Sequence, residues 1–172
     1  YVAAVILDPA REIEGLTDSK QLTEKKREQL FDQICSTAIA YCIEYATVEE
    51  IEEYNIWGAI SMAMCRAVTA LSVTPSLALI DGNLTPKGIT VPARPIVKGD
   101  ALSASIAAAS ILAKVSRDRY MKTLDHQFPD YGFAKHKGYG TAAHIAAIRE
   151  HGVLPIHRKS FLKSIAAKIE NK

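Results

Sequence analysis

Two aspartates, Asp81 and Asp100, combine a residue type and a position that suit chemistry. Asp81 follows the apolar residues 77–80, and Asp100 follows the apolar residues 91–97 and a Lys-Gly step. Ligands gather at the carboxyl ends of strands in open α/β sheets. Two carboxylates lying close together repel each other when both are charged, so the pair needs a cation between them. Oxygen ligands favour Mg²⁺ or Mn²⁺, and no histidine or cysteine set has zinc-site spacing. We therefore predict a divalent-cation site.

A structural interpretation of the same residues stays open. Asp81, Gly82 and Asn83 are typical of a turn, and Asp100 can be the N-cap of the helix that follows. The composition of that helix favours the functional interpretation. Residues 101–109 are mostly alanine and serine, which leave room for a backbone or a bulky ligand, whereas core packing alone would favour leucine.

The rest of the chain supplies the elements that would position this site. Apolar patterns predict strands at residues 2–7, 38–46, 77–81 and 91–97. Helical spacing and capping residues predict a helix at residues 24–37, a short acidic helix that begins at the Thr47 and Glu50 capping box, and a helix at 55–71 with Ile56 facing the core. A long helix is predicted at 101–127, ending before Pro129, and another at 142–151, ending at Gly152. A basic helix is predicted at the C-terminus. Strands that alternate with helices indicate an α/β fold with a mixed sheet, in one domain of residues 1–172.

The composition is that of an ordinary globular protein. The 172 residues are 48% hydrophobic and 23% charged, which argues against a disordered chain or a membrane protein. The net charge of +2 is too small to indicate nucleic acid by itself, so any such role depends on where the basic residues cluster. Three cysteines, Cys35, Cys42 and Cys65, lie in apolar surroundings without metal-ligand spacing. We expect buried free thiols in a reducing compartment, the cytoplasm.

Polar and basic residues cluster in the loops at residues 17–20, 130–140 and 157–160. The second of these is rich in aromatic residues and glycine, and such loops often carry function. His136 and His157 lie in these loops and could donate hydrogen bonds to phosphate, whereas His126, His144 and His151 are expected at helix ends or surfaces. Tyr139 fits a ligand contact and a loop anchor equally well.

Six segments, in order along nearly the whole chain, resemble bacterial ribonuclease HII. They are Asp18-Ser19-Lys20, Ile80-Asp81-Gly82-Asn83, Lys98-Gly99-Asp100, the run from Ala107 to Val115 with Arg117 and Asp118, the loop from His136 to Thr141, and the segment from His157 to Phe161. The resemblance implies a ribonuclease H-like mixed sheet flanked by helices, with a C-terminal helical extension. It also implies an endoribonuclease that cleaves RNA in RNA·DNA duplexes, including single ribonucleotides embedded in DNA, and leaves 3′-hydroxyl and 5′-phosphate ends.

In that family four acids bind two divalent ions, Mg²⁺ or Mn²⁺, and the resemblance makes Asp81 and Asp100 the third and fourth. The family carries the first two as adjacent Asp and Glu on its first strand, followed by a Gly-Arg-Gly turn, and this chain has no such sequence. Because the chain also starts inside an apolar run at Tyr1, we expect an N-terminally incomplete domain. Two alternatives stay open: a module that binds nucleic acid without cutting it, and a marginally folded fragment without activity.

The resemblance also implies substrate contacts. Tyr139 matches the tyrosine that packs on the sugar at the junction between RNA and DNA. A duplex backbone attracts cations whatever its sequence, so the expected phosphate contacts are Lys20, Lys98, Lys137, Arg158 and Lys159. Ser19 and His136 are further expected substrate contacts. We place Asp118 outside the metal site, as the partner in an ion pair between turns of the long helix. The expected partners are RNA·DNA hybrids and DNA that contains ribonucleotides, and the protein is expected to be a monomer.

Overall fold

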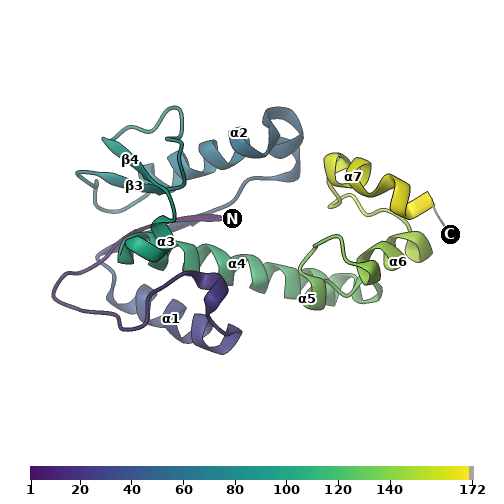
Figure 1. Ribbon diagram of the computed structural model, residues 1–172, viewed down its shortest axis with the longest axis horizontal. Helices are drawn as coiled ribbons and strands as arrows, with labels where there is room; N and C mark the ends of the chain where they lie inside the picture. Colours follow the sequence, from purple (N-terminus) through teal and green to yellow (C-terminus); the bar gives the residue numbers. More distant parts are fainter. Residues whose placement is uncertain (171–172) are drawn as a thin grey trace.

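The structure is a computed structural model that describes the backbone of residues 1–170 and the side chains of residues 1–166 (Figure 1). Its four strands form two pairs. Strand β1 (Val2–Ile6) runs antiparallel to β2 (Ala40–Glu44), and β3 (Ala78–Asp81) runs parallel to β4 (Ala93–Ile96). The predicted α/β class with strands of mixed direction is confirmed. Within residues 1–170 the strands make two sheets instead of one continuous sheet.

A cavity of about 620 Å³ lies between the two sheets. It is lined by the strand β1, by β3 and by small residues of the long helix α4 (Ala104–Gln127), among them Ser105, Ala109 and Ala113. Each strand is paired on one edge only, so the cavity separates the unpaired edges of β1 and β3. The two sheets remain apart because no strand of the described residues bridges this space.

The helices α1 (Glu24–Thr37) and α2 (Val48–Thr69) begin where the capping residues predict. Thr23 accepts a hydrogen bond from the backbone of Lys26, and Thr47 forms a capping box with Glu50. Helix α2 is broken at Asn55, whose φ of 59° is not helical and whose side chain caps the second half through Trp57 N and Gly58 N. The predicted boundary between a short acidic helix and an apolar one is therefore confirmed at Asn55.

The helix predicted at residues 101–127 is wrong at its start, where the structure has two helices, α3 (Gly99–Leu102) and α4. They are separated by Ser103, whose backbone is extended and whose hydroxyl accepts a hydrogen bond from Ile106 N. A serine side chain that can bond its own helix terminus competes with helical backbone, and here it starts a new helix.

The C-terminal part contains the short η2 (Pro129–Tyr131) and α5 (Phe133–His136), followed by α6 (Ala142–His151) and α7 (Lys159–Glu170). The predicted Thr141 cap and Gly152 stop of α6 are confirmed. Figure 1 shows these helices at one end of α4, with β3, β4 and α3 at the other end. The long helix α4 therefore spans the distance between the two aspartates and the glycine-rich loop.

Three hydrophobic clusters hold these parts together. The largest joins α1 to α4 through Leu30, Ile34 and Ile111, a second lies among the C-terminal helices, and a third packs α2 on β1. Ile56 was expected to face the core, but it is 50% exposed because it lies directly after the break at Asn55, and Ala59 is buried in its place. The cysteines are free as expected, but half-buried.

Candidate active site

The first carboxylate, Asp81, lies at the C-terminal end of β3 and contacts the turn that leads to Asp100. Its Oδ1 accepts a hydrogen bond from the backbone N–H of Gly99 at 2.9 Å. Parallel pairing of β3 with β4 places Asp81 opposite Ile96, two residues before Lys98, and so brings the turn beside it. Gly99 is buried, and a Cβ atom there would lie 2.5 Å from Ile106 Cδ1. Only glycine fits at this contact without displacement of a neighbour.

The second carboxylate, Asp100, is half-buried in the first turn of α3. Lys98 precedes this helix in the left-handed conformation (φ 56°), which turns the chain from β4 into α3. The structural interpretation of Asp100 as an N-cap is not borne out, because Lys98 occupies that position without a side-chain cap. The two aspartates thus lie on adjoining turns at one sheet edge, as the spacing predicts.

Asp81 and Asp100 carry charges that the rest of the site leaves unbalanced. Neither is part of an ion pair in residues 1–166. Because Gly99 occupies only Oδ1 of Asp81, the other oxygen can coordinate a cation, and carboxylate oxygens suit Mg²⁺ or Mn²⁺. Over the same residues, no group of three or more His, Cys, Asp or Glu side chains is placed to hold a metal ion. The pair fits a divalent cation, but as half of a ligand set.

Known proteins with similar sequences identify the family of this chain. The sequence model of the family described as Ribonuclease HII matches residues 1–164. The chain is 55% identical over 172 residues to the ribonuclease HII of Shewanella oneidensis, an alignment of 98% of this chain and 82% of that protein. It is 57% identical over 162 residues to the ribonuclease HII of Laribacter hongkongensis, covering 94% of this chain and 82% of that protein. The chain belongs to the ribonuclease HII family.

Solved structures agree with this assignment. The ribonuclease H2 of Pyrococcus horikoshii superposes with a TM-score of 0.71 and 25% identity, over 92% of this chain and 83% of that one. The fold also matches the ribonuclease HII in the PCNA complex from Archaeoglobus fulgidus (TM-score 0.66, 20% identity, 92% and 82% coverage). The family resemblance and the fold class expected from the sequence are confirmed. Membership makes the protein a metal-dependent endoribonuclease that cleaves RNA in RNA–DNA hybrids.

Tyr139 is available for contact with such a substrate. Its side chain is 61% exposed, and its ring lies 5.3 Å from the guanidinium carbon of Arg117 on α4. Lys137 and Gly138 before it are both in the left-handed conformation, so the backbone reverses direction and presents the ring outward. Sequence reasoning placed Arg117 on the long helix, in a segment that resembles ribonuclease HII, and predicted no contact with Tyr139. No sequence signal shows its contact with Tyr139, because residues 22 positions apart meet only through the tertiary fold.

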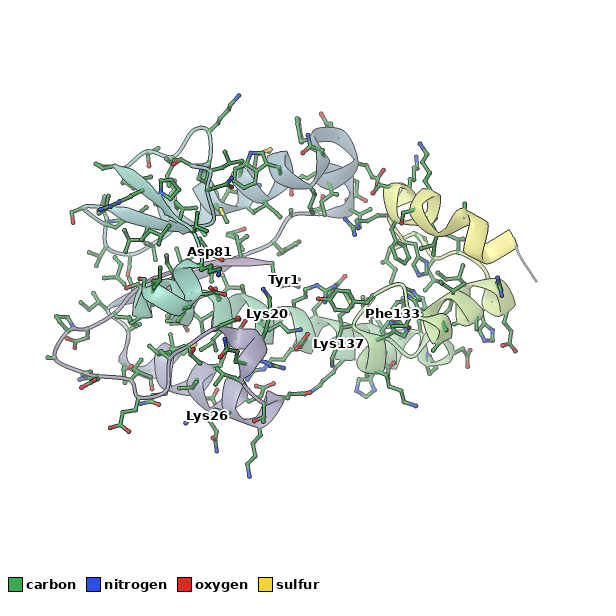
Figure 2. The ribbon with its side chains drawn as sticks, viewed as in Figure 1. Tyr1, Lys20, Lys26, Asp81, Phe133 and Lys137 are labelled. Atoms are coloured by element: carbon green, nitrogen blue, oxygen red, sulfur yellow. The ribbon has the colours of Figure 1, made fainter. Side chains whose placement is uncertain are left out.

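The predicted lysine contacts lie on three different turns. Lys20 is exposed in η1 (Ser19–Gln21), and Lys98 is exposed beside the aspartates. Lys137 is half-buried. The pKa of Glu24 is lowered mainly by a hydrogen bond from Lys122, and the charge of Lys137 lowers it further. Lys137 therefore lies near Glu24, at the start of α1. In Figure 2, Asp81, Lys20 and Lys137 follow one another along the molecule toward the C-terminal helices.

The predicted contact of Ser19 with substrate does not fit the position of its side chain, which is buried, with 7% of the residue exposed. Its carbonyl oxygen accepts a hydrogen bond from Arg27, and Arg27 also lies 3.9 Å from Asp118. Asp118 is 4% exposed and bonds Lys114 at 2.8 Å, so it forms the expected ion pair of the long helix. This network fixes the turn that presents Lys20.

His136, His144 and His157 differ from the expectation because all three are buried together, at 8%, 1% and 8% exposure. His136 and His157 were predicted as phosphate donors, but their ring nitrogens contact protein groups. The Nε2 atom of His136 lies 2.7 Å from the carbonyl oxygen of Tyr131, and that of His157 lies 3.1 Å from Nε2 of His144. Aromatic residues of η2, α5 and α7 pack around the rings and shield them from water.

Arg158 and Lys159 lie at the start of α7, opposite the acidic end of α2. Glu52 of α2 accepts hydrogen bonds from the backbone N–H and the hydroxyl of Ser160. The backbone hydrogen bond is the largest cause that lowers the pKa of Glu52, and the charges of Lys159 and Arg158 lower it further. Arg158 is half-buried and Lys159 is exposed. A phosphate at this position would share these cations with Glu52.

Proposed function

We propose that Asp81 and Asp100 hold divalent ions, Mg²⁺ or Mn²⁺, against the scissile phosphate of an RNA strand paired with DNA. Divalent ions supply an activated water and stabilise the leaving oxygen in this class of hydrolysis. The proposed products carry a 3′-hydroxyl and a 5′-phosphate. The hydrogen bond from Gly99 to Asp81 supports the proposal, because it holds one carboxylate beside the turn that carries the other. In addition, neither carboxylate has an ion-pair partner within residues 1–166.

The residues of this chain have separate tasks in the proposed site. Asp81 and Asp100 would hold the divalent ions, while Lys98 and Lys20 contact the neighbouring phosphates. Tyr139 packs on the sugar where RNA meets DNA, and Lys137 contacts the duplex backbone nearby. Arg117 orients the tyrosine ring by the cation–π contact. The substrates are hybrid duplexes and DNA that contains single ribonucleotides.

The two further acids implied by the family resemblance have no counterpart in this chain, and we propose that an additional strand supplies them. The cavity between β1 and β3 supports this step, because both strands offer it an unpaired edge and α4 offers it small side chains. One extended segment that bonds to both edges would join the two sheets into one. Its last residues would then lie beside Asp81 at the end of β3.

Cleavage of a DNA duplex that contains one ribonucleotide, with Mg²⁺ or Mn²⁺, tests the assignment. The assay compares the 172-residue chain with a chain extended at its N-terminus by an Asp-Glu strand and a Gly-Arg-Gly turn. We expect the extended form to cut much faster, and Asp81→Asn or Asp100→Asn to lose that activity. Asp130→Asn, at an exposed position of η2, is the matched control. Equal cleavage by Asp81→Asn and the parent would show that the site is wrong.

A binding measurement addresses the module that grips nucleic acid without cutting it. Affinity for a hybrid duplex should fall steeply with salt, because each phosphate contact releases a counterion. Binding without cleavage by the extended form would favour this second interpretation.

We further propose that the protein is a monomer in the cytoplasm. Its half-buried free cysteines suit a reducing compartment, and no described helix is long and apolar enough to cross a membrane.

A further inference from the structure

The three buried histidines form a hydrogen-bonded group whose proton positions can be worked out from their partners. The backbone N–H of Leu154 donates to Nδ1 of His157 at 2.9 Å, so that nitrogen carries no proton. A neutral His157 then has its proton on Nε2, which lies 3.1 Å from Nε2 of His144. Nε2 of His144 must then accept this hydrogen bond, so the proton of a neutral His144 is on Nδ1.

That proton has an acceptor in the loop that carries Tyr139. Nδ1 of His144 lies 3.0 Å from the carbonyl oxygen of Tyr139, which also accepts the backbone N–H of Thr141 at 2.8 Å. The same logic holds for His136, whose Nδ1 accepts the N–H of Gly138 at 3.1 Å and whose Nε2 therefore donates to Tyr131 O. Two neutral rings thus hold the backbone on both sides of the Gly138–Tyr139 bond.

We propose that His144 and His157 are positioning residues that orient Tyr139 through a one-directional hydrogen-bond chain from Leu154 N–H to Tyr139 C=O. The chain is complete only when both rings are neutral. A proton added to His144 would set two N–H groups against each other at 3.1 Å, and one added to Nδ1 of His157 would face the Leu154 N–H. Either event breaks a buried hydrogen bond, which is costly.

The surroundings favour the neutral rings. Burial is the largest cause that lowers the pKa of His144 and of His157, and electrostatic repulsion from the neighbouring His136 ring lowers both further. His136 from α5 stacks on His144 at 4.2 Å, Tyr131 from η2 packs on His157, and Phe133 and Phe161 cover the pair from α5 and α7. A histidine with a lowered folded pKa contributes its full stability above the unfolded value, about 6.5, and loses it as the pH falls below that value.

Nitrogen-15 spectra of the imidazole rings test the chain directly and need no activity. At pH 8 we expect His144 as the Nδ1–H tautomer and His157 and His136 as Nε2–H tautomers. An Nε2–H tautomer of His144, or a charged ring at pH 8, would overturn the proposal. This arm is independent of the proposed nuclease mechanism.

A functional arm rests on the proposed role of Tyr139. His144→Phe keeps the ring volume but removes the donor, so kcat/KM of the extended chain should fall about fivefold, the effect of one lost hydrogen bond. The loss should vanish in a Tyr139→Ala background, and His144→Asn, which restores an N–H donor, should recover part of it. His126→Phe at the exposed end of α4 is the control. An equal loss with and without Tyr139 would mean a purely structural role and contradict the proposal.

Discussion

The backbone N–H of Gly99 and the carboxylate of Asp81 are joined by a hydrogen bond of 2.9 Å across two parallel strands. This bond couples the end of β3 to the turn that begins α3, so it holds Asp81 beside the turn that carries Asp100. It also explains why residues without side-chain bulk surround the site. Gly99 must approach Asp81 and Ile106 closely, and α4 must leave space beside them.

Gly99→Ala should disturb this coupling. The added Cβ would lie 2.5 Å from Ile106 Cδ1 and 3.3 Å from Asp81 Oδ1. Overpacking of this kind lowers the free energy of unfolding by about 1–2 kcal/mol, and cleavage should fall because Asp81 is displaced. Ile106→Val removes the clashing carbon, so the double variant should regain stability in urea denaturation. No recovery in the double variant would mean that the strain has another source.

Tyr139→Ala should weaken the contact with substrate without loss of fold. An aromatic contact with a nucleic acid contributes about 1–2 kcal/mol, which corresponds to about 5–30-fold in kcat/KM. Tyr139→Phe should stay near the parent, since it keeps the ring that faces Arg117. Tyr41→Ala, in β2, controls for loss of an exposed tyrosine. If the phenylalanine variant lost as much activity as the alanine variant, the hydroxyl and not the ring would carry the role.

Asp118→Ala should be strongly destabilising although we place Asp118 outside the proposed metal site. It leaves Lys114 and Arg27 without their carboxylate partner, and breaking a buried pair in this way costs about 3–5 kcal/mol. Asp32→Ala, at an exposed position of α1, should change the unfolding free energy by less than about 0.5 kcal/mol. Denaturant unfolding of both variants gives the comparison. Similar values for the two would contradict the ion-pair role.

The sequence predicted the elements that depend on local signals. Thr23, Thr47, Thr141, Pro129 and Gly152 mark helix ends because their caps and breaks act over a few residues. The break at Ser103 was missed because serine and alanine also occur inside helices. The burial of His136 and His157 was missed for a different reason: their partners come from η2 and α6, and only tertiary packing brings these together. The adjacency of Asp81 and the turn of Asp100 could be predicted because the ends of parallel strands share one sheet edge, whereas their role as metal ligands stays a prediction.

Titration with Mn²⁺ followed by amide NMR tests the shared cation site most directly. A paramagnetic ion broadens the signals of nearby nuclei, so the amides of Gly82, Gly99 and Asp100 should broaden first. The effect should disappear in the Asp81→Asn/Asp100→Asn variant and persist in Asp130→Asn. Broadening confined to the acidic residues 49–53, or unchanged by the double substitution, would contradict the assignment of Asp81 and Asp100 as the metal ligands.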